Sequence, residues 1–381
     1  MKYLKDIMKM IDTVKIVLSY SQRPDWFEQA RSQRSFDLTS GLFKAVTNPS
    51  IGYKKRGIYQ PRLTYTERPL GQYRKSYELA IELSLPKLMF GNNFTELTDG
   101  TFLDVIKKLS ENIRTTYNIW LFPHVLQKAS VRKIDYSKNI VFTDRTPVST
   151  ITSNMRRANI STVYNVQDDK FRNGGHIYHI HCNSIDIAMY DKVADLNQSK
   201  VSEKRSYEKD GYMQISLLDE LEKERTITVA RFEVRLNGKR KINSELNAIG
   251  ITNSNLTIEE MFSTDISRKI LLRHWHNIFD RIPKALLDTE TPEQLLINIT
   301  KSTPNIKARE ALAVVGLKLL SNNHDERYVR NLMEGLFTPS QYRRLSQKCR
   351  EPLDPTQLKT LIQVTEILTA MTPVSIDDYN L

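Results

Sequence analysis

The chain has 381 residues, of which 56 are lysine or arginine and 44 are aspartate or glutamate, so its formal net charge is +12. This length predicts two or three domains, and the 40% hydrophobic share predicts a folded core with the excess charge on its surface. The charge excludes an acidic mimic of a polyanion. It favours a polyanionic partner, which is DNA, RNA or an anionic membrane surface.

Cysteine content and hydropathy predict where the protein works. Cys182 and Cys349 are too few for a disulfide framework or a cysteine zinc site, so we expect a reduced, cytoplasmic setting. No apolar stretch reaches the roughly 18 residues of a transmembrane helix. Segment 1–10 has scattered charges and no apolar core, so we expect no signal peptide, and Met10 offers a second plausible start.

The first two-thirds of the chain alternates strand-like and helix-like patterns. We expect strands at 14–20, 59–65, 76–85, 131–136, 176–182, 185–192 and 226–236. We expect helices at 101–113, 149–158 and 214–225, and an exposed polar segment at 197–210. This mixture predicts an α+β fold, in which helices cover one face of an antiparallel or mixed sheet.

After about residue 255 the strand patterns stop and helical patterns follow. Helices are expected at 258–279, 292–299, 306–320, 325–336 and 339–348. Thr291-Pro292 and Thr338-Pro339 place a hydroxyl residue before a proline, which is typical of helix N-termini. We therefore predict a first domain over 1–250, a linker near 250–256 and an all-α domain over 256–381.

One predicted hairpin gathers titratable side chains. If Asn183-Ser184 forms its two-residue turn, strand alternation puts His179, His181, Asp186 and Tyr190 on one face of the sheet. The functional interpretation is a metal or catalytic site. The alternative is that the histidines are polar surface and that the tyrosine packs at a sheet edge.

Two other predicted strands carry a carboxylate in an apolar setting. Asp135 lies between Ile134 and Tyr136, and Glu233 shares one strand face with Arg231 and Arg235. A buried carboxylate needs a partner, a metal or solvent. Either Glu233 forms a salt-bridge ladder with arginines across strands, or the carboxylates hold a hard cation, Mg²⁺ or Mn²⁺, that polarises a phosphate oxygen.

Five blocks, in order along the chain, carry a resemblance to a known family. They are MIDTV (10–14), ELSLPKLMFGNN (82–93), VRKID (131–135), MYDK (189–192) and VARFEVRL (229–236). With these blocks the chain resembles the filamentous-phage and plasmid replication initiators of the gene II/X type. It resembles more distantly the rolling-circle initiators of Gram-positive plasmids.

The resemblance implies a metal-dependent DNA nickase and strand transferase with a Rep-like fold. The family's nucleophile corresponds to Tyr190, which would form a 5′-phosphotyrosine and free a 3′-hydroxyl for polymerase. The metal-holding carboxylates correspond to Asp135 and Glu233, with Mg²⁺ or Mn²⁺ as the cofactor. A single active tyrosine would leave termination to a second protomer or to water.

The resemblance also implies roles for nearby basic residues and histidines. Lys192, Arg231 and Arg235 would contact the scissile phosphate or the DNA strand. His179 and His181 spell the His-hydrophobe-His pattern of the wider HUH nuclease class, although that pattern usually lies on a different strand. We retain them as further metal candidates.

The C-terminal helices carry further basic residues, among them Arg309, Arg343 and Arg344. They could form a helix-turn-helix-like module that binds duplex origin DNA, or a helical cap or dimerisation domain with solvated charges. The implied partners are origin DNA, host helicase and polymerase and a second copy of the chain, in a bacterial cytoplasm and without a membrane. The alternatives are a non-catalytic DNA-binding replication or repressor factor and a conjugative relaxase.

Overall fold

The computed structural model divides the chain into two compact units, each built from separate stretches of sequence. The first unit contains Met1–Arg145, Ser184–Leu272 and Leu368–Leu381, and the second contains Thr146–Asn183 and Arg273–Ile367. The structure describes residues 8–9, 11–25, 33–37, 41–71, 73–143, 146–172, 176–192, 228–252, 255–282, 296–297, 299–301, 303, 305–323, 326–348 and 359–375. The domain boundary expected near residues 250–256 is a boundary along the sequence, which units defined by spatial contacts do not test. It stays a prediction.

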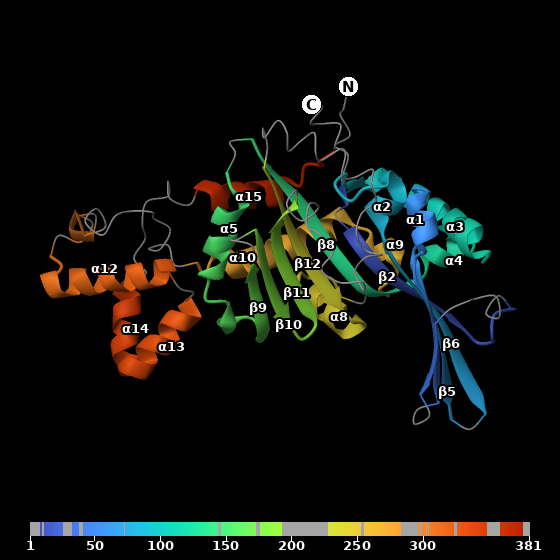
Figure 1. Cartoon of the computed structure of the whole chain (residues 1–381), viewed down its shortest axis with the longest axis horizontal. Helices are drawn as coiled ribbons and strands as arrows, with labels where there is room; N and C mark the ends of the chain where they lie inside the picture. The colour runs from blue at the N-terminus through green and yellow to red at the C-terminus, as the bar shows by residue number, and fades with distance from the viewer. Residues whose placement is uncertain are drawn as a thin grey trace. The chain divides into compact units, whose positions relative to one another are not determined.

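The first unit is built on a large antiparallel sheet (Figure 1). Its strands follow in space the order β3 (Gln33–Asp37), β4 (Leu42–Thr47), β5 (Arg62–Leu70), β6 (Arg74–Ser84), β2 (Ile11–Tyr20), β8 (Ser130–Phe142), β12 (Thr228–Asn237) and β11 (Ile185–Asp191). Every neighbouring pair in this series is antiparallel. A short separate pair joins β1 (Met8–Lys9) to β7 (Leu97–Thr98).

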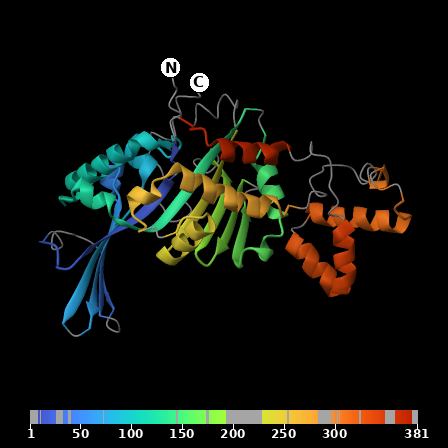
Figure 2. The same ribbon diagram turned by 180° about the vertical axis from the view of Figure 1, so that it is seen from behind.

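Helices cover one face of this sheet. The first unit contains α1 (Ile51–Lys55), α2 (Leu85–Phe90), α3 (Phe102–Tyr117), α4 (Pro123–Gln127), α8 (Lys239–Ala248) and α9 (Ile258–Met261). Seen from behind, α8 lies across the strands (Figure 2). Helix α3 buries Val105, Ile106, Leu109 and Ile113, which is the face that its sequence spacing predicted.

The two faces of the central strands differ in chemistry because side chains alternate along each strand. On β12, Phe232 and Val234 point to the apolar core, and both are fully buried. The intervening residues of β12, with those paired to them on β8 and β11, form a polar face. This polar face holds the candidate site.

The second unit combines a strand pair with helices. Strands β9 (Val166–Arg172) and β10 (Ile177–Cys182) pair antiparallel. The helices include α5 (Val148–Arg156), α12 (Ala308–Asn323), α13 (Glu326–Leu336), α14 (Pro339–Lys348) and most of α15 (Lys359–Ala370). Residues of α12, α13 and α14 share one apolar cluster, which includes Val314, Val329 and Tyr342.

The α+β class, the antiparallel sheet and the helices toward the C-terminus are confirmed. The single helix expected over 258–279 is wrong, because α9 ends at Met261 and α10 (Thr264–Phe279) begins three residues later. Strands β3, β4 and β9 and helix α8 were not predicted. The expectations for 197–210, for 214–225 and for most of 292–299 lie outside the described residues. Within the described part of the chain, no helix has the length and apolarity to cross a membrane.

Candidate active site

Three neighbouring strands bring the predicted site residues together. Tyr190 of β11 is paired with Arg231 of β12, and Arg235 of β12 is paired with Asp135 of β8. Paired residues of an antiparallel ladder point to the same face. Arg231, Glu233 and Arg235 therefore share that face, as their alternation in the sequence predicted.

Tyr190 is held by a buried carboxylate. Its hydroxyl donates a hydrogen bond to Glu233 Oε1 at 2.5 Å, and Glu233 is 2% exposed. Arg235 Nε donates to the other oxygen, Oε2, at 3.0 Å, and Arg231 Nε lies 3.3 Å from Oε1. Glu233 thus receives the tyrosine hydroxyl between two arginines, and Tyr190 itself is only partly buried.

The charge state of Glu233 follows from these partners. Burial alone would raise the pKa of its carboxyl, but Arg235, Arg231 and the hydrogen bond from Tyr190 outweigh burial and hold the pKa well below its usual range. Glu233 is therefore a carboxylate at neutral pH. It accepts the tyrosine proton as a hydrogen bond without taking it in the resting protein.

Arg231 connects this pair to distant parts of the sequence. Its guanidinium donates to the carbonyl oxygen of Asn93 at 2.6 Å and to Ser137 Oγ at 2.8 Å, and lies 3.5 Å from Asp12 Oδ1. The arginine is 2% exposed. Four of the five blocks quoted above thus contribute residues to one connected group, which contains Asp12, Asn93, Tyr190 and Arg231 with Glu233.

Asp135 lies on the same face in a second charge cluster. Its Oδ2 is 3.3 Å from Lys133 Nζ, and Lys133 is 3.4 Å from Glu82 Oε1. Burial raises the pKa of Asp135 to about 7, although Lys133 and Arg235 oppose the shift. Asp135 Oδ1 is buried and accepts no hydrogen bond from the residues that the structure describes.

Asp135 Oδ1 is the feature of the site that fits a hard cation, because such cations bind oxygen ligands. The oxygens of Glu233 are already engaged by Tyr190 and the two arginines. Across the described ranges, no three histidine, cysteine, aspartate or glutamate side chains form a group that could hold a metal. A metal held by Asp135 therefore remains a proposal.

The remaining predicted site residues lie at the end of β11 or in the second unit. Lys192 directly follows β11 and is 1% exposed. His179 and His181 are on β10 in the second unit, with their rings 6.3 Å apart and tilted edge to face. In the same unit Arg309 lies on α12, and Arg343 and Arg344 lie on α14, all three exposed.

The site also contains residues that the sequence interpretation missed. Asp12, Asn93 and Ser137 all bind Arg231, and none was assigned a role. Asp12 is the second residue of β2 and precedes the strand expected over 14–20, so strand alternation gave no signal for it. Asn93 contacts Arg231 only through its backbone carbonyl. Every residue has such a carbonyl, so the residue type at position 93 could not indicate this contact.

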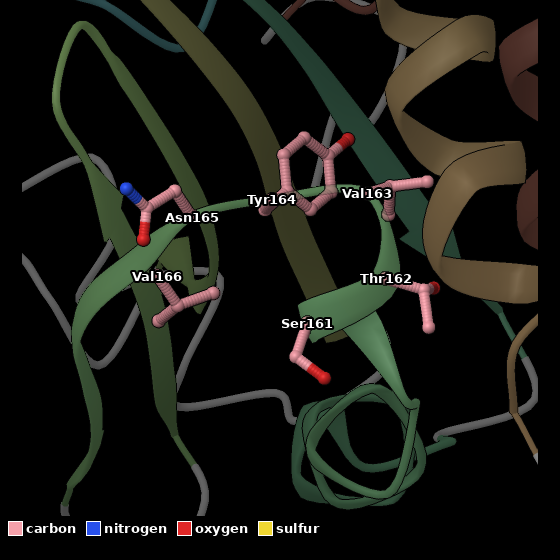
Figure 3. Close-up of a pocket in the computed structure, with 6 residues that line it drawn as sticks. All are labelled: Ser161, Thr162, Val163, Tyr164, Asn165 and Val166. Carbon is pink, nitrogen blue, oxygen red and sulfur yellow. The ribbon is translucent and has the colours of Figure 1, made fainter.

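A separate hollow lies in the second unit (Figure 3). It has a volume of about 430 Å³ and is lined by residues 161–166. The Tyr164 hydroxyl makes a 2.7 Å hydrogen bond with His274 Nδ1, so this tyrosine is part of the packing of its unit. None of the predicted site residues lines the hollow.

Comparisons with known proteins assign no family to this chain. No family model matches the chain. No curated protein matches it. The crystal structure of DynU16, a protein in the dynemicin biosynthetic locus, is similar over 68% of this chain and 96% of its own, with 9% identity and a TM-score of 0.17. A likeness of that size carries no argument on fold or function.

Proposed function

We propose that the protein is a rolling-circle replication initiator, which nicks one DNA strand at an origin through Tyr190 and later rejoins the displaced strand. The observation that supports this most is the partly exposed Tyr190 hydroxyl bound to Glu233 between two arginines. A nucleophile needs an adjacent group to orient and activate it, and Glu233 does this for Tyr190.

The proposed reaction is an exchange of phosphodiester bonds. Tyr190 Oη attacks the scissile phosphorus, the Oη–P bond forms and the bond from phosphorus to the 3′-oxygen breaks. The phenolic proton moves along the hydrogen bond to Glu233 and from there to the leaving 3′-oxygen. Because a carboxylate of low pKa is a weak base, the positive charge of the arginines or of a metal has to assist the removal of the phenolic proton, and the reverse sequence rejoins the strand.

The positive charges suit the transition state. The Arg235 side chain is 35% exposed, so it can reach a phosphate while it holds Glu233. Arginine forks match phosphate oxygens in geometry. Mg²⁺ or Mn²⁺ held by Asp135 would polarise a phosphate oxygen.

The proposal extends to partners. Arg309, Arg343 and Arg344 on exposed helix surfaces would bind duplex origin DNA. Host helicase and polymerase would act on the nicked origin in the bacterial cytoplasm, and a second protomer would assist termination. The Rep-like, HUH-type identity of the nuclease fold belongs to this proposal as well.

One observation favours a second candidate, a non-catalytic DNA-binding factor. Glu233 forms ion pairs with Arg231 and Arg235, which is what a purely structural carboxylate would do. This candidate predicts DNA binding that needs no divalent metal and leaves no covalent protein–DNA adduct.

A nicking assay separates the two candidates. The purified protein is incubated with Mg²⁺ or Mn²⁺ and supercoiled DNA that carries the intergenic region of its genetic element. We expect nicked circles with the parent protein and with Tyr77→Phe, a control on strand β6, and none with Tyr190→Phe. Nicking by Tyr190→Phe at the parent rate would overturn the assignment of the nucleophile.

A further inference from the structure

The β5–β6 hairpin forms the edge of a projecting part of the sheet, where the turn before β4 still reaches β5: a Cβ on Gly41 would lie 3.1 Å from the Pro69 ring. Strand β4 pairs with β5 only as far as Glu67, and β2 pairs with β6 only as far as Tyr77. Beyond these points β5 and β6 continue to pair with each other through Leu70 and Arg74. In Figure 1 the labelled β5 and β6 project together from the sheet of the first unit.

The base of this hairpin is anchored and its end is open. Ala45 and Tyr65 are buried at the base, with Phe43 and Tyr77 packed against them. At the end, Tyr73 is 91% exposed and Leu70 is 59% exposed. An exposed aromatic and an exposed leucine on a firmly held hairpin indicate a surface for a partner.

The exposed end is also basic. Arg68, Arg74 and Lys75 are exposed, and the one acidic residue of the segment 67–75, Glu67, is bonded to Lys75 at 2.5 Å. The two arginines flank the exposed Tyr73 and Leu70. Positive charge around an apolar end is complementary to the phosphate rims and base edges of a nucleic-acid groove.

We propose that the β5–β6 hairpin end, residues 68–71 and 73–75, binds duplex DNA at its major groove. This groove is about 12 Å wide and 8.5 Å deep and admits the turn of a β-hairpin. Arg68 and Arg74 contact phosphates on the rims, and Tyr73 contacts base edges.

The inference deepens the proposed function, on which its biological meaning rests. It assigns duplex recognition to a strand hairpin of the first unit, in addition to the C-terminal helices. Salt-dependent binding tests it directly, because each lost phosphate contact lowers the slope of log affinity against log salt by about 0.9.

The test measures fluorescence anisotropy of a labelled mixed-sequence duplex of about three helical turns, between about 50 and 200 mM salt. We expect Arg68→Ala/Arg74→Ala to weaken binding at least about tenfold and to lower the salt slope by about 2. Tyr73→Ala should weaken binding with an unchanged slope, because no charge is removed. The full-length protein carries each change.

The matched control is Lys239→Ala/Arg240→Ala, which removes two exposed charges from α8 of the same unit. Binding by the hairpin double variant within about twofold of the parent, or equal to that of the control, overturns the inference. The same result would follow if the hairpin bound an acidic protein instead of DNA.

A second readout keeps this test apart from that of the proposed function. Covalent trapping of a single-stranded oligonucleotide depends on Tyr190 and should be unchanged in the hairpin variants. If the parent forms no adduct but the variants lose duplex affinity, the inference holds and the nickase proposal fails. If adducts form and duplex affinity is unchanged, only the inference fails.

Discussion

Replacing Arg231 by methionine should unfold the first unit more readily than any surface substitution. Arg231 is the cation next to both Asp12 and Glu233, and it also satisfies the Asn93 carbonyl and Ser137. Methionine fills a similar volume but leaves these groups buried without their partner. Breaking a buried ion pair from one side costs about 3–5 kcal/mol of unfolding free energy.

The assay is urea denaturation at pH 7 with linear extrapolation, and Arg132→Met is the control. Arg132 pairs with Glu78 on neighbouring strands, but its side chain is 35% exposed. An ion pair of that exposure contributes about 0–1 kcal/mol. A loss below about 1 kcal/mol in Arg231→Met, or a loss equal to that of Arg132→Met, would refute the reasoning.

Three further changes have defined outcomes. Burial raises the pKa of Asp135 to about 7, so the protonated carboxyl is favoured in the folded protein. The resulting stabilisation of the fold is complete below about pH 4 and is lost as pH rises through 7. Between about pH 4 and pH 7, the unfolding free energy of the metal-free parent should therefore fall by up to about 4 kcal/mol more than that of Asp135→Asn. Equal pH dependence of the unfolding free energy in parent and variant would contradict this. Lys138→Met should cost about 3–5 kcal/mol, because it strips the buried Glu96 of an ammonium 2.6 Å away; a thermal shift near zero would contradict it. Tyr164→Phe should cost about 1–3 kcal/mol, since His274 loses a buried hydrogen bond; unchanged urea unfolding would contradict that.

Local patterns predicted much of the candidate site. Alternation along VARFEVRL placed Arg231, Glu233 and Arg235 on one face, and the structure confirms that Glu233 contacts both arginines. The ion-pair interpretation of Glu233 was one of the two stated alternatives. Both arginines lie on the strand of Glu233 itself, where a ladder across strands had been expected.

The partners of Arg231 could not be predicted because they depend on the order of strands in space. Asp12 approaches Arg231 only because β2 and β12 both pair with β8. Strand order is set by packing of the whole core, and no local signal encodes it. Asn93 reaches the same arginine from the loop after α2.

Strand β8 was predicted over six residues and spans thirteen. Its second half contains Ser137, Lys138 and Asn139, which have low strand propensity. Tertiary contacts override that propensity, since Lys138 binds Glu96 and the Asn139 side chain donates to the Phe94 carbonyl. The break between α9 and α10 was missed because the apolar spacing continues across it.

The most direct test of the central claim is to locate the covalent bond to DNA. The adduct formed with Mg²⁺ or Mn²⁺ is digested with nuclease and protease, and the peptide that retains a nucleotide is sequenced by mass spectrometry. The account predicts a 5′-phosphate on Tyr190 and no adduct in Tyr190→Phe. A nucleotide on any other residue, or nicking without an adduct, would contradict it.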